Sequence, residues 1–141
     1  MTTLQETVRT KLKKLAKPSI KEGSEKYFKN VITFHGVKAA DVKKVMKETF
    51  LLLKNKPIEE AVRESFSLLA SDIFEEKQVG VGILSKYVQK LPENILKKLG
   101  PIFEKHVYDW ATSDMLSGRV LRFLIKKDEK PTMRAARFVQ H

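Results

Sequence analysis

Apolar residues recur three or four positions apart through almost the whole chain, and this spacing constrains the fold more than any other feature. It places them along one face of an α-helix. The first set is Leu4, Val8, Leu12 and Leu15. No segment alternates convincingly between apolar and polar residues, as a half-buried strand would. The spacing predicts an all-α chain. The first helices are expected over 2–16, from Gly23–Ser24 to a break at His35–Gly36, and over 40–54 and 57–69. The later ones are expected over 72–90, from Pro92 past Phe103, over about 109–126 and over 132–141.

Proline and glycine mark weak points and ends of these helices. Pro18 ends the first run. Gly80 and Gly82 are expected to weaken the middle of their helix, and Gly100–Pro101 to kink the next one or split it in two. About eight helices joined by short turns, such as residues 128–131, indicate either a bundle or a helical-repeat solenoid. No strict internal repeat chooses between the two.

The length of 141 residues suits one domain with a hydrophobic core, which we place over residues 1–141. No uncharged apolar run approaches the roughly 20 residues that a membrane span needs. The first residues lack the apolar core of a signal peptide. The absence of cysteine excludes disulfides and thiolate metal sites. We therefore expect a cytoplasmic protein, associated with the nucleoid if the source is prokaryotic, and no membrane contact.

The net charge of +11 is distributed unevenly along the chain. Residues 1–56 carry 14 Lys or Arg and 5 Asp or Glu, residues 57–109 carry 7 and 9, and residues 110–141 carry 7 and 3. The two ends are basic and the middle is not. A polyanionic partner explains this pattern, with nucleic acid ahead of an anionic membrane. The plainer explanation is solubility conferred by surface lysines.

Several common catalytic and metal-binding patterns are missing. The chain has no P-loop, no dinucleotide-binding glycine pattern and no nucleophile elbow. His35, His106 and His141 lack metal-ligand spacing, so we expect surface or capping histidines and no metal. The pairs Glu59–Glu60 and Glu75–Glu76 are expected to lie on solvated faces rather than to act as acid and base.

The only tryptophan, Trp110, precedes Asp114 by four positions. On a helix the two residues share a face. The pair is then either a core tryptophan beside a solvated carboxylate, or an aromatic and anionic surface suited to a cationic ligand. Asp109 adjoins Trp110 and competes for the same role, although it is also placed to cap the helix.

Three stretches carry a resemblance to a known family. They are residues 26–46 (KYFKNVITFHGVKAADVKKVM), residues 71–87 (SDIFEEKQVGVGILSKY), and residues 108–118 followed by TMRAARFVQH at 132–141. In this order they resemble the AlkD-like DNA alkylation repair family, whose members are DNA glycosylases built from HEAT-like helical repeats. The resemblance covers essentially the whole chain. Family members are longer, so the chain resembles an N-terminal part that lacks the C-terminal repeats.

The resemblance implies a function and a set of site residues. Family members hold duplex DNA on a concave basic face and excise N3- and N7-alkylated purines, which carry a positive charge, without a metal or cofactor. Trp110 would then face the damaged nucleotide, and Asp114 would stabilise the cationic sugar and help to position water. Arg134 matches a DNA-contacting arginine, although its separation from Asp114 is shorter than the family usually shows. Tyr27 matches the aromatic residue of the first stretch.

The residue types suit this chemistry independently of the resemblance. A carboxylate stabilises the positive charge that grows on the sugar as the base leaves, and an aromatic face adds cation–π attraction of about 0.5–2 kcal/mol. Arg137, Lys43 and Lys44 are further candidates for phosphate contacts.

Two other functions stay open at this stage, a non-catalytic nucleic-acid-binding module and a protein–protein scaffold. A solenoid without its terminal repeats also exposes an apolar end, which predicts self-association there.

Overall fold

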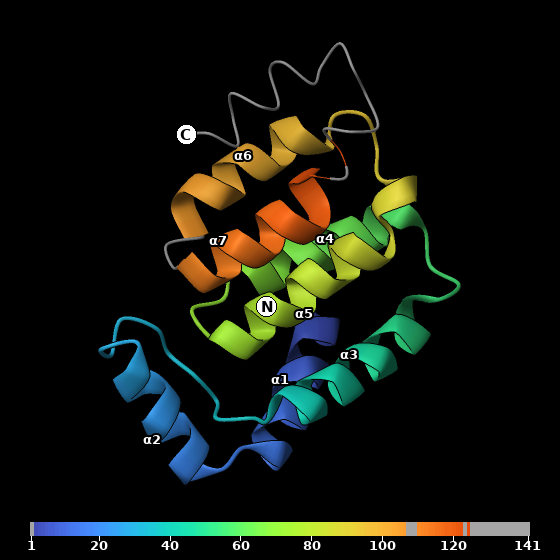
Figure 1. Ribbon diagram of the computed structural model, residues 1–141. Helices are drawn as coiled ribbons and strands as arrows, with labels where there is room; N and C mark the ends of the chain where they lie inside the picture. The colour runs from blue at the N-terminus through green and yellow to red at the C-terminus, as the bar shows by residue number, and fades with distance from the viewer. Residues whose placement is uncertain (1, 107–109, 123, 125–141) are drawn as a thin grey trace.

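The structure is a computed structural model that describes residues 2–106, 110–122 and 124, with the side chains of 110 and 111 outside the description. Within these ranges the fold is all-helical and contains no strand, as the sequence predicted, and it is consistent with a HEAT-like helical solenoid. Figure 1 shows the arrangement of the helices. They are α1 (Thr3–Leu15), α2 (Pro18–Tyr27), α3 (Ala39–Leu53), α4 (Ile58–Leu69), α5 (Phe74–Lys86), α6 (Ile95–His106) and α7 (Trp110–Leu116).

Helix α5 is the centre of the molecule, and α3 and α7 lie on either side of it (Figure 1). Val79 and Ile83 of α5 join a core cluster with α1, α3 and α4. Val81 and Leu84 join a second cluster with α4, α6 and α7. Most residues of α5 are buried, the charged side chains of Glu75, Glu76 and Lys77 among them, so the helix is covered on several sides. The two clusters therefore share one helix.

Helix α5 runs without a break through Gly80 and Gly82, the residues that were expected to weaken its middle. A Cβ atom at Gly80 would lie 2.9 Å from the carbonyl oxygen of Ser65 in α4, so only glycine permits this approach. A Cβ atom at Gly82 would overlap the thioether of Met46 in α3. Close packing of three helices therefore offsets the low helix propensity of glycine.

The second helix differs from its predicted position. It begins at Pro18 and ends at Tyr27, whereas the prediction began at Gly23–Ser24 and continued through Val31 and Ile32. Proline is favourable in the first turn because its missing N–H has no partner there. Beyond the helix, Ile32 is buried and Val31 is exposed, so their apolar character does not reflect a shared helical face.

The helices after α5 also have different ends from those predicted. Helix α5 stops at Lys86 and is followed by a 3₁₀ turn over Val88–Lys90, instead of continuing to residue 90. Helix α6 begins at Ile95 rather than at Pro92. Pro101 lies inside α6 and does not split it, because Ile95 and Leu99 anchor the helix in the core.

The last described helix continues into an unusual turn. After α7, residues Ser117–Leu121 form a π-helical turn with Val120 and Leu121 buried. The predicted turn at 128–131 and the predicted helix at 132–141 lie outside the described residues. None of the helices in the described ranges is long and apolar enough to cross a membrane.

Candidate functional site

Trp110 and Asp114 lie on one helix, one turn apart, as the sequence predicted. Asp114 is exposed to solvent. Its carboxylate forms no hydrogen bond and no ion pair with any described residue. The side chain of Trp110 lies outside the description, and so does Asp109. The structure thus describes an accessible carboxylate on the predicted helix.

The helix that carries Asp114 is firmly anchored. Leu116, Val120 and Leu121 are buried in the cluster that α5 and α6 also form. Thr112 is buried as well. Because these side chains fix the inner face of α7 and the π turn, Asp114 has a defined position on the outer face. The π turn adds a local widening of a kind often found at functional sites.

Two arginines that sequence reasoning did not single out are also exposed on this segment. Arg119 lies in the π turn and Arg122 directly follows it, and both are solvent-exposed. The sequence could have indicated them, because both arginines follow Asp114 within the predicted helix over 109–126. The positive charges of the arginines attract an anionic ligand. The negative charge of Asp114 suits a ligand that also carries a positive charge at one point.

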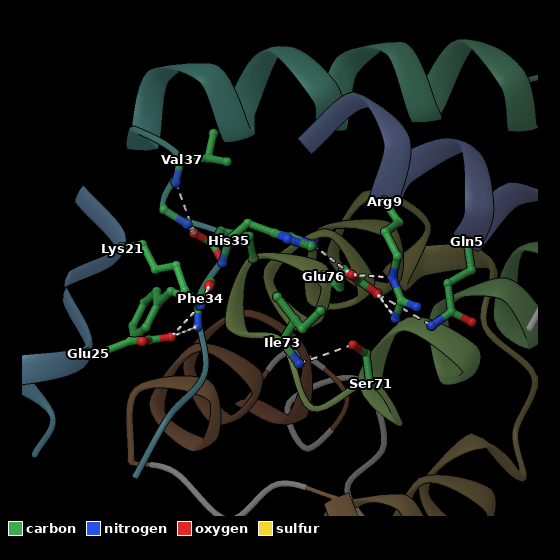
Figure 2. A network of polar contacts seen from close by, with 12 residues as sticks. Gln5, Arg9, Lys21, Glu25, Phe34, His35, Val37, Ser71, Ile73 and Glu76 are labelled. Atoms are coloured by element: carbon green, nitrogen blue, oxygen red, sulfur yellow. Dashed lines mark hydrogen bonds and ion pairs between the residues drawn. The ribbon is translucent and has the colours of Figure 1, made fainter. Parts of the chain in front are cut away.

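Glu75 and Glu76 are buried, and the prediction that they are solvated is wrong. Their exposed fractions are 2% and 0%. They lie in the first turn of α5, beneath the segment that connects α2 to α3 and against α1. Burial of two carboxylates is unfavourable unless each finds hydrogen-bond partners. Both do, and Figure 2 shows Glu76 with its partner Arg9.

Glu75 binds three consecutive backbone N–H groups of the connecting segment. Its carboxylate oxygens accept hydrogen bonds from the backbone nitrogens of His35 at 2.8 Å, Gly36 at 2.9 Å and Val37 at 3.0 Å. Hydrogen bonds from backbone N–H groups to a carboxylate are among the stronger hydrogen bonds in proteins. Glu75 therefore fixes the backbone of a segment that has no regular secondary structure of its own.

Glu76 is surrounded by cationic and polar partners. Arg9 of α1 donates two hydrogen bonds to it, at 2.9 and 3.0 Å, and the Nε2 atom of His35 lies 2.8 Å away. Burial raises the pKa of Glu76, but hydrogen bonds from His35, Arg9 and Ser71, with the charge of Arg9, outweigh it and leave the pKa at about 2. His35 is thus buried, and the prediction of a surface or capping histidine is wrong for this residue.

A third carboxylate holds the other end of the same segment. Glu25 of α2 accepts hydrogen bonds from the backbone nitrogen of Phe34 and from the Nζ atom of Lys21, both at 2.9 Å. These two bonds, with the charge of Lys21, lower its pKa. Behind it, the rings of Phe34 and Phe74 lie 5.0 Å apart. Glu25, Glu75 and Glu76 are therefore structural ties, and their hydrogen-bonding capacity is already occupied.

The other predicted contact residues lie on separate elements. Tyr27 ends α2 and is 74% exposed. Lys43 and Lys44 are exposed on α3, which Figure 1 shows on the opposite side of α5 from α7. The structure describes no contact between these lysines and Asp114. Arg134, Arg137 and His141 lie outside the described residues.

The described part of the chain contains no cluster of side chains suited to a metal ion. Among residues 2–106, 110–122 and 124, no three His, Asp or Glu side chains are grouped so that they could hold a metal ion. Glu59 is exposed and Glu60 partly so, as the sequence predicted for this pair.

Comparison with known proteins gives one match. Residues 8–141 match the model of a family described as DNA alkylation repair enzyme. The match includes all three stretches that carried the resemblance, and it extends over the residues that the structure does not describe. No curated protein and no solved structure matches the chain.

Proposed function

Because the chain belongs to the DNA alkylation repair enzyme family, we propose that it is a DNA glycosylase that removes positively charged N3- or N7-alkylated purines from duplex DNA. DNA alkylation repair is the function that the family match supports. The alkylpurine substrate, the glycosylase reaction and the site residues are our proposal.

The observation that carries the proposal is the accessibility of Asp114. Glu75 and Glu76 are buried and fully engaged with the protein, whereas Asp114 is exposed on a helix fixed in the core. An exposed carboxylate in a chain of net charge +11 is available to a ligand that is anionic overall and cationic at one point. A duplex with one alkylated purine has this distribution of charge.

The reaction needs little more than charge stabilisation. The glycosidic bond between C1′ and the purine nitrogen breaks, and its electron pair neutralises the formal charge of the departing base. Positive charge then develops on the sugar, where the carboxylate of Asp114 stabilises it electrostatically. Water adds to C1′ and loses a proton to solvent. Trp110 is proposed to face the damaged nucleotide, where its ring adds cation–π attraction.

Cationic and aromatic residues on several elements are proposed to hold the duplex. Tyr27, Lys43 and Lys44 are exposed on α2 and α3, and Arg119 and Arg122 follow Asp114. Phosphate contacts from such side chains fix the position of the duplex without reading its sequence. Arg134 and Arg137 are proposed for the same role. Self-association through the exposed end of the solenoid is a further proposal.

The decisive experiment measures release of N7-methylguanine from methylated duplex DNA by the wild-type chain, Asp114→Asn and Glu59→Gln. Glu59 is an exposed carboxylate on α4 and serves as the matched control. We expect release by the wild type and by Glu59→Gln, and its loss in Asp114→Asn. Equal release by all three proteins would refute the role of Asp114. DNA binding without release by the wild type would refute the glycosylase function for this chain.

A further inference from the structure

Helix α2 ends in a tight hydrogen-bonded turn with Lys29 at its centre. The backbone N–H of Asn30 donates to the carbonyl of Glu25 at 2.7 Å, and that of Lys29 donates to the carbonyl of Lys26 at 3.0 Å. These two bonds define the Schellman motif, in which one residue adopts the left-handed conformation. That residue is Lys29, with φ of 54°, and Asn30 follows with φ of 61°.

Lysine is an unfavourable residue at this position. Glycine is the usual choice, because a Cβ atom is crowded in the left-handed region. Asparagine tolerates that region better than lysine does. The strain at Lys29 is therefore a property of its side chain, and replacement by glycine would relieve it without changing the turn. Strain of this kind is characteristic of functional positions.

The surrounding structure holds the turn in place. The ring of Phe28 stacks on that of Phe34 at 5.6 Å, and Ile32 is buried. Glu25 binds the backbone of Phe34, as Figure 2 shows, and Glu75 binds that of His35. Inward-facing residues thus anchor the segment on both sides of Lys29, so the turn is rigid before any ligand arrives.

The outward-facing residues of the turn are largely exposed, although the ring of Tyr27 meets that of Phe28 edge-on, with 5.0 Å between the ring centroids. Tyr27 is 74% and Val31 66% exposed, and Lys29 and Asn30 are exposed too. Lys29 forms no ion pair with any residue in the described part of the chain. Residues 17–38 contain five lysines and two glutamates, and one of these glutamates, Glu25, is already bonded to Lys21. The surface around the turn is therefore basic.

We propose that Lys29 contacts a phosphate of duplex DNA, with Tyr27 and Val31 packing against the adjacent sugars. The inference rests on the proposed function, because it assumes that the chain binds a duplex. An ammonium group supplies the charge, and two exposed apolar surfaces beside it suit the deoxyribose rings between phosphates. A rigid turn loses little conformational freedom on binding. The strained lysine is thus a DNA-contacting residue.

The test rests on one substitution, Lys29→Gly, that is expected to raise the stability of the protein and to weaken its binding to DNA. Lys29→Gly removes the strain and the charge, Lys29→Gln removes mainly the charge, and Lys29→Arg keeps both. Lys56→Gln removes an exposed charge from the connection between α3 and α4 and is the control. We expect Lys29→Gly to raise the melting temperature by about 2–4 °C.

Binding to an unmodified duplex is measured for each variant over a range of salt concentrations. We expect Lys29→Gly and Lys29→Gln to bind about five- to tenfold more weakly at 0.1 M salt, with the slope of log K against log salt reduced in magnitude by about 0.9. Lys29→Arg and Lys56→Gln should retain the wild-type slope. A better-folded variant that binds more weakly cannot be explained by structural damage.

Two outcomes would overturn the inference, and they differ in what they say about the proposed function. If the wild type binds DNA and releases N7-methylguanine, but Lys29→Gly and Lys29→Gln keep the wild-type slope, the phosphate contact is refuted and the glycosylase proposal stands. If the wild type does not bind a duplex, both are refuted. Should Lys29→Gly fail to fold, Lys29→Gln alone decides, since it keeps an unbranched polar side chain at the same position.

Discussion

Arg9 and Glu76 lie 67 positions apart in the sequence and form a doubly hydrogen-bonded ion pair, with bonds of 2.9 and 3.0 Å. The glutamate is fully buried, and the arginine is partly exposed. The pair joins the first helix to the central helix. His35 completes the arrangement from the connection between α2 and α3. Three segments that are distant in sequence thus meet at one carboxylate.

Removal of Arg9 should destabilise the fold strongly. Arg9→Ala leaves the buried carboxylate without its main cationic partner, and we expect a loss of about 3 kcal/mol in the free energy of unfolding. Urea denaturation measures the change. The control is Lys11→Ala on the same helix as Arg9. It breaks a partly exposed pair with Glu48 of α3, and its effect should be much smaller. Equal effects of the two substitutions would contradict the structural importance of the buried pair.

Acid should weaken the fold through Glu76. Its pKa is about 2 in the folded protein, against 4.5 for an unperturbed glutamate. Because the folded-state pKa is depressed, the stabilisation is present above pH 4.5 and is lost as the pH falls towards 2. The loss from this one group is on the order of 3 kcal/mol. Thermal unfolding measured from pH 6 to pH 2 should follow this course, and Glu76→Gln, less stable at pH 6, should show a flatter profile.

Two glycines should respond in opposite directions to the same substitution. Gly36 has φ of 93°, and an added Cβ atom would lie 2.6 Å from the Cβ atom of Lys21. We expect Gly36→Ala to cost about 2–3 kcal/mol of stability. Gly23 lies inside α2 with open space around the added atom, so Gly23→Ala should stabilise by about 0.5–1 kcal/mol. Chemical denaturation of both variants tests the description of the segment between α2 and α3.

Asp114→Asn should separate activity from stability. The residue is exposed and has no described partner, so we expect the free energy of unfolding to change by less than about 0.5 kcal/mol. Release of N7-methylguanine should fall about 10²- to 10³-fold, the usual effect of removing one electrostatic stabiliser of a transition state. Parallel denaturation and single-turnover assays test this expectation. A strongly destabilised variant would instead indicate a structural role.

The sequence predicted those helices that are specified by the spacing of their own apolar residues. The apolar spacing over 2–16, 40–54 and 57–69 gave α1, α3 and α4 to within one residue at each end. The second helix was misplaced because Val31 and Ile32 imitate helical spacing although one is exposed and the other buried. A local pattern cannot distinguish a helical face from two adjacent residues of an irregular segment.

The polar interior could not be predicted in the same way. Glu75 and Glu76 resemble any acidic pair at the start of a helix, where negative charge is favourable. Their partners lie about 40 and 67 positions earlier in the chain, so nothing in their own neighbourhood indicates burial. For Asp114 the position on the helix followed from its spacing to Trp110, while its role depends on a resemblance rather than on the pattern itself.

The tie between Arg9 and Glu76 also has a consequence for the order of folding during synthesis. At a synthesis rate of about 5–20 residues per second, some 3–13 seconds pass between the addition of Arg9 and that of Glu76, 67 positions later. During this interval the first three helices lack the acidic groups that hold them to α5. A ribosome-bound chain of this protein therefore exposes its most basic third in an unassembled form, and the ion pair that ties that third to α5 forms only after residue 76 has been added.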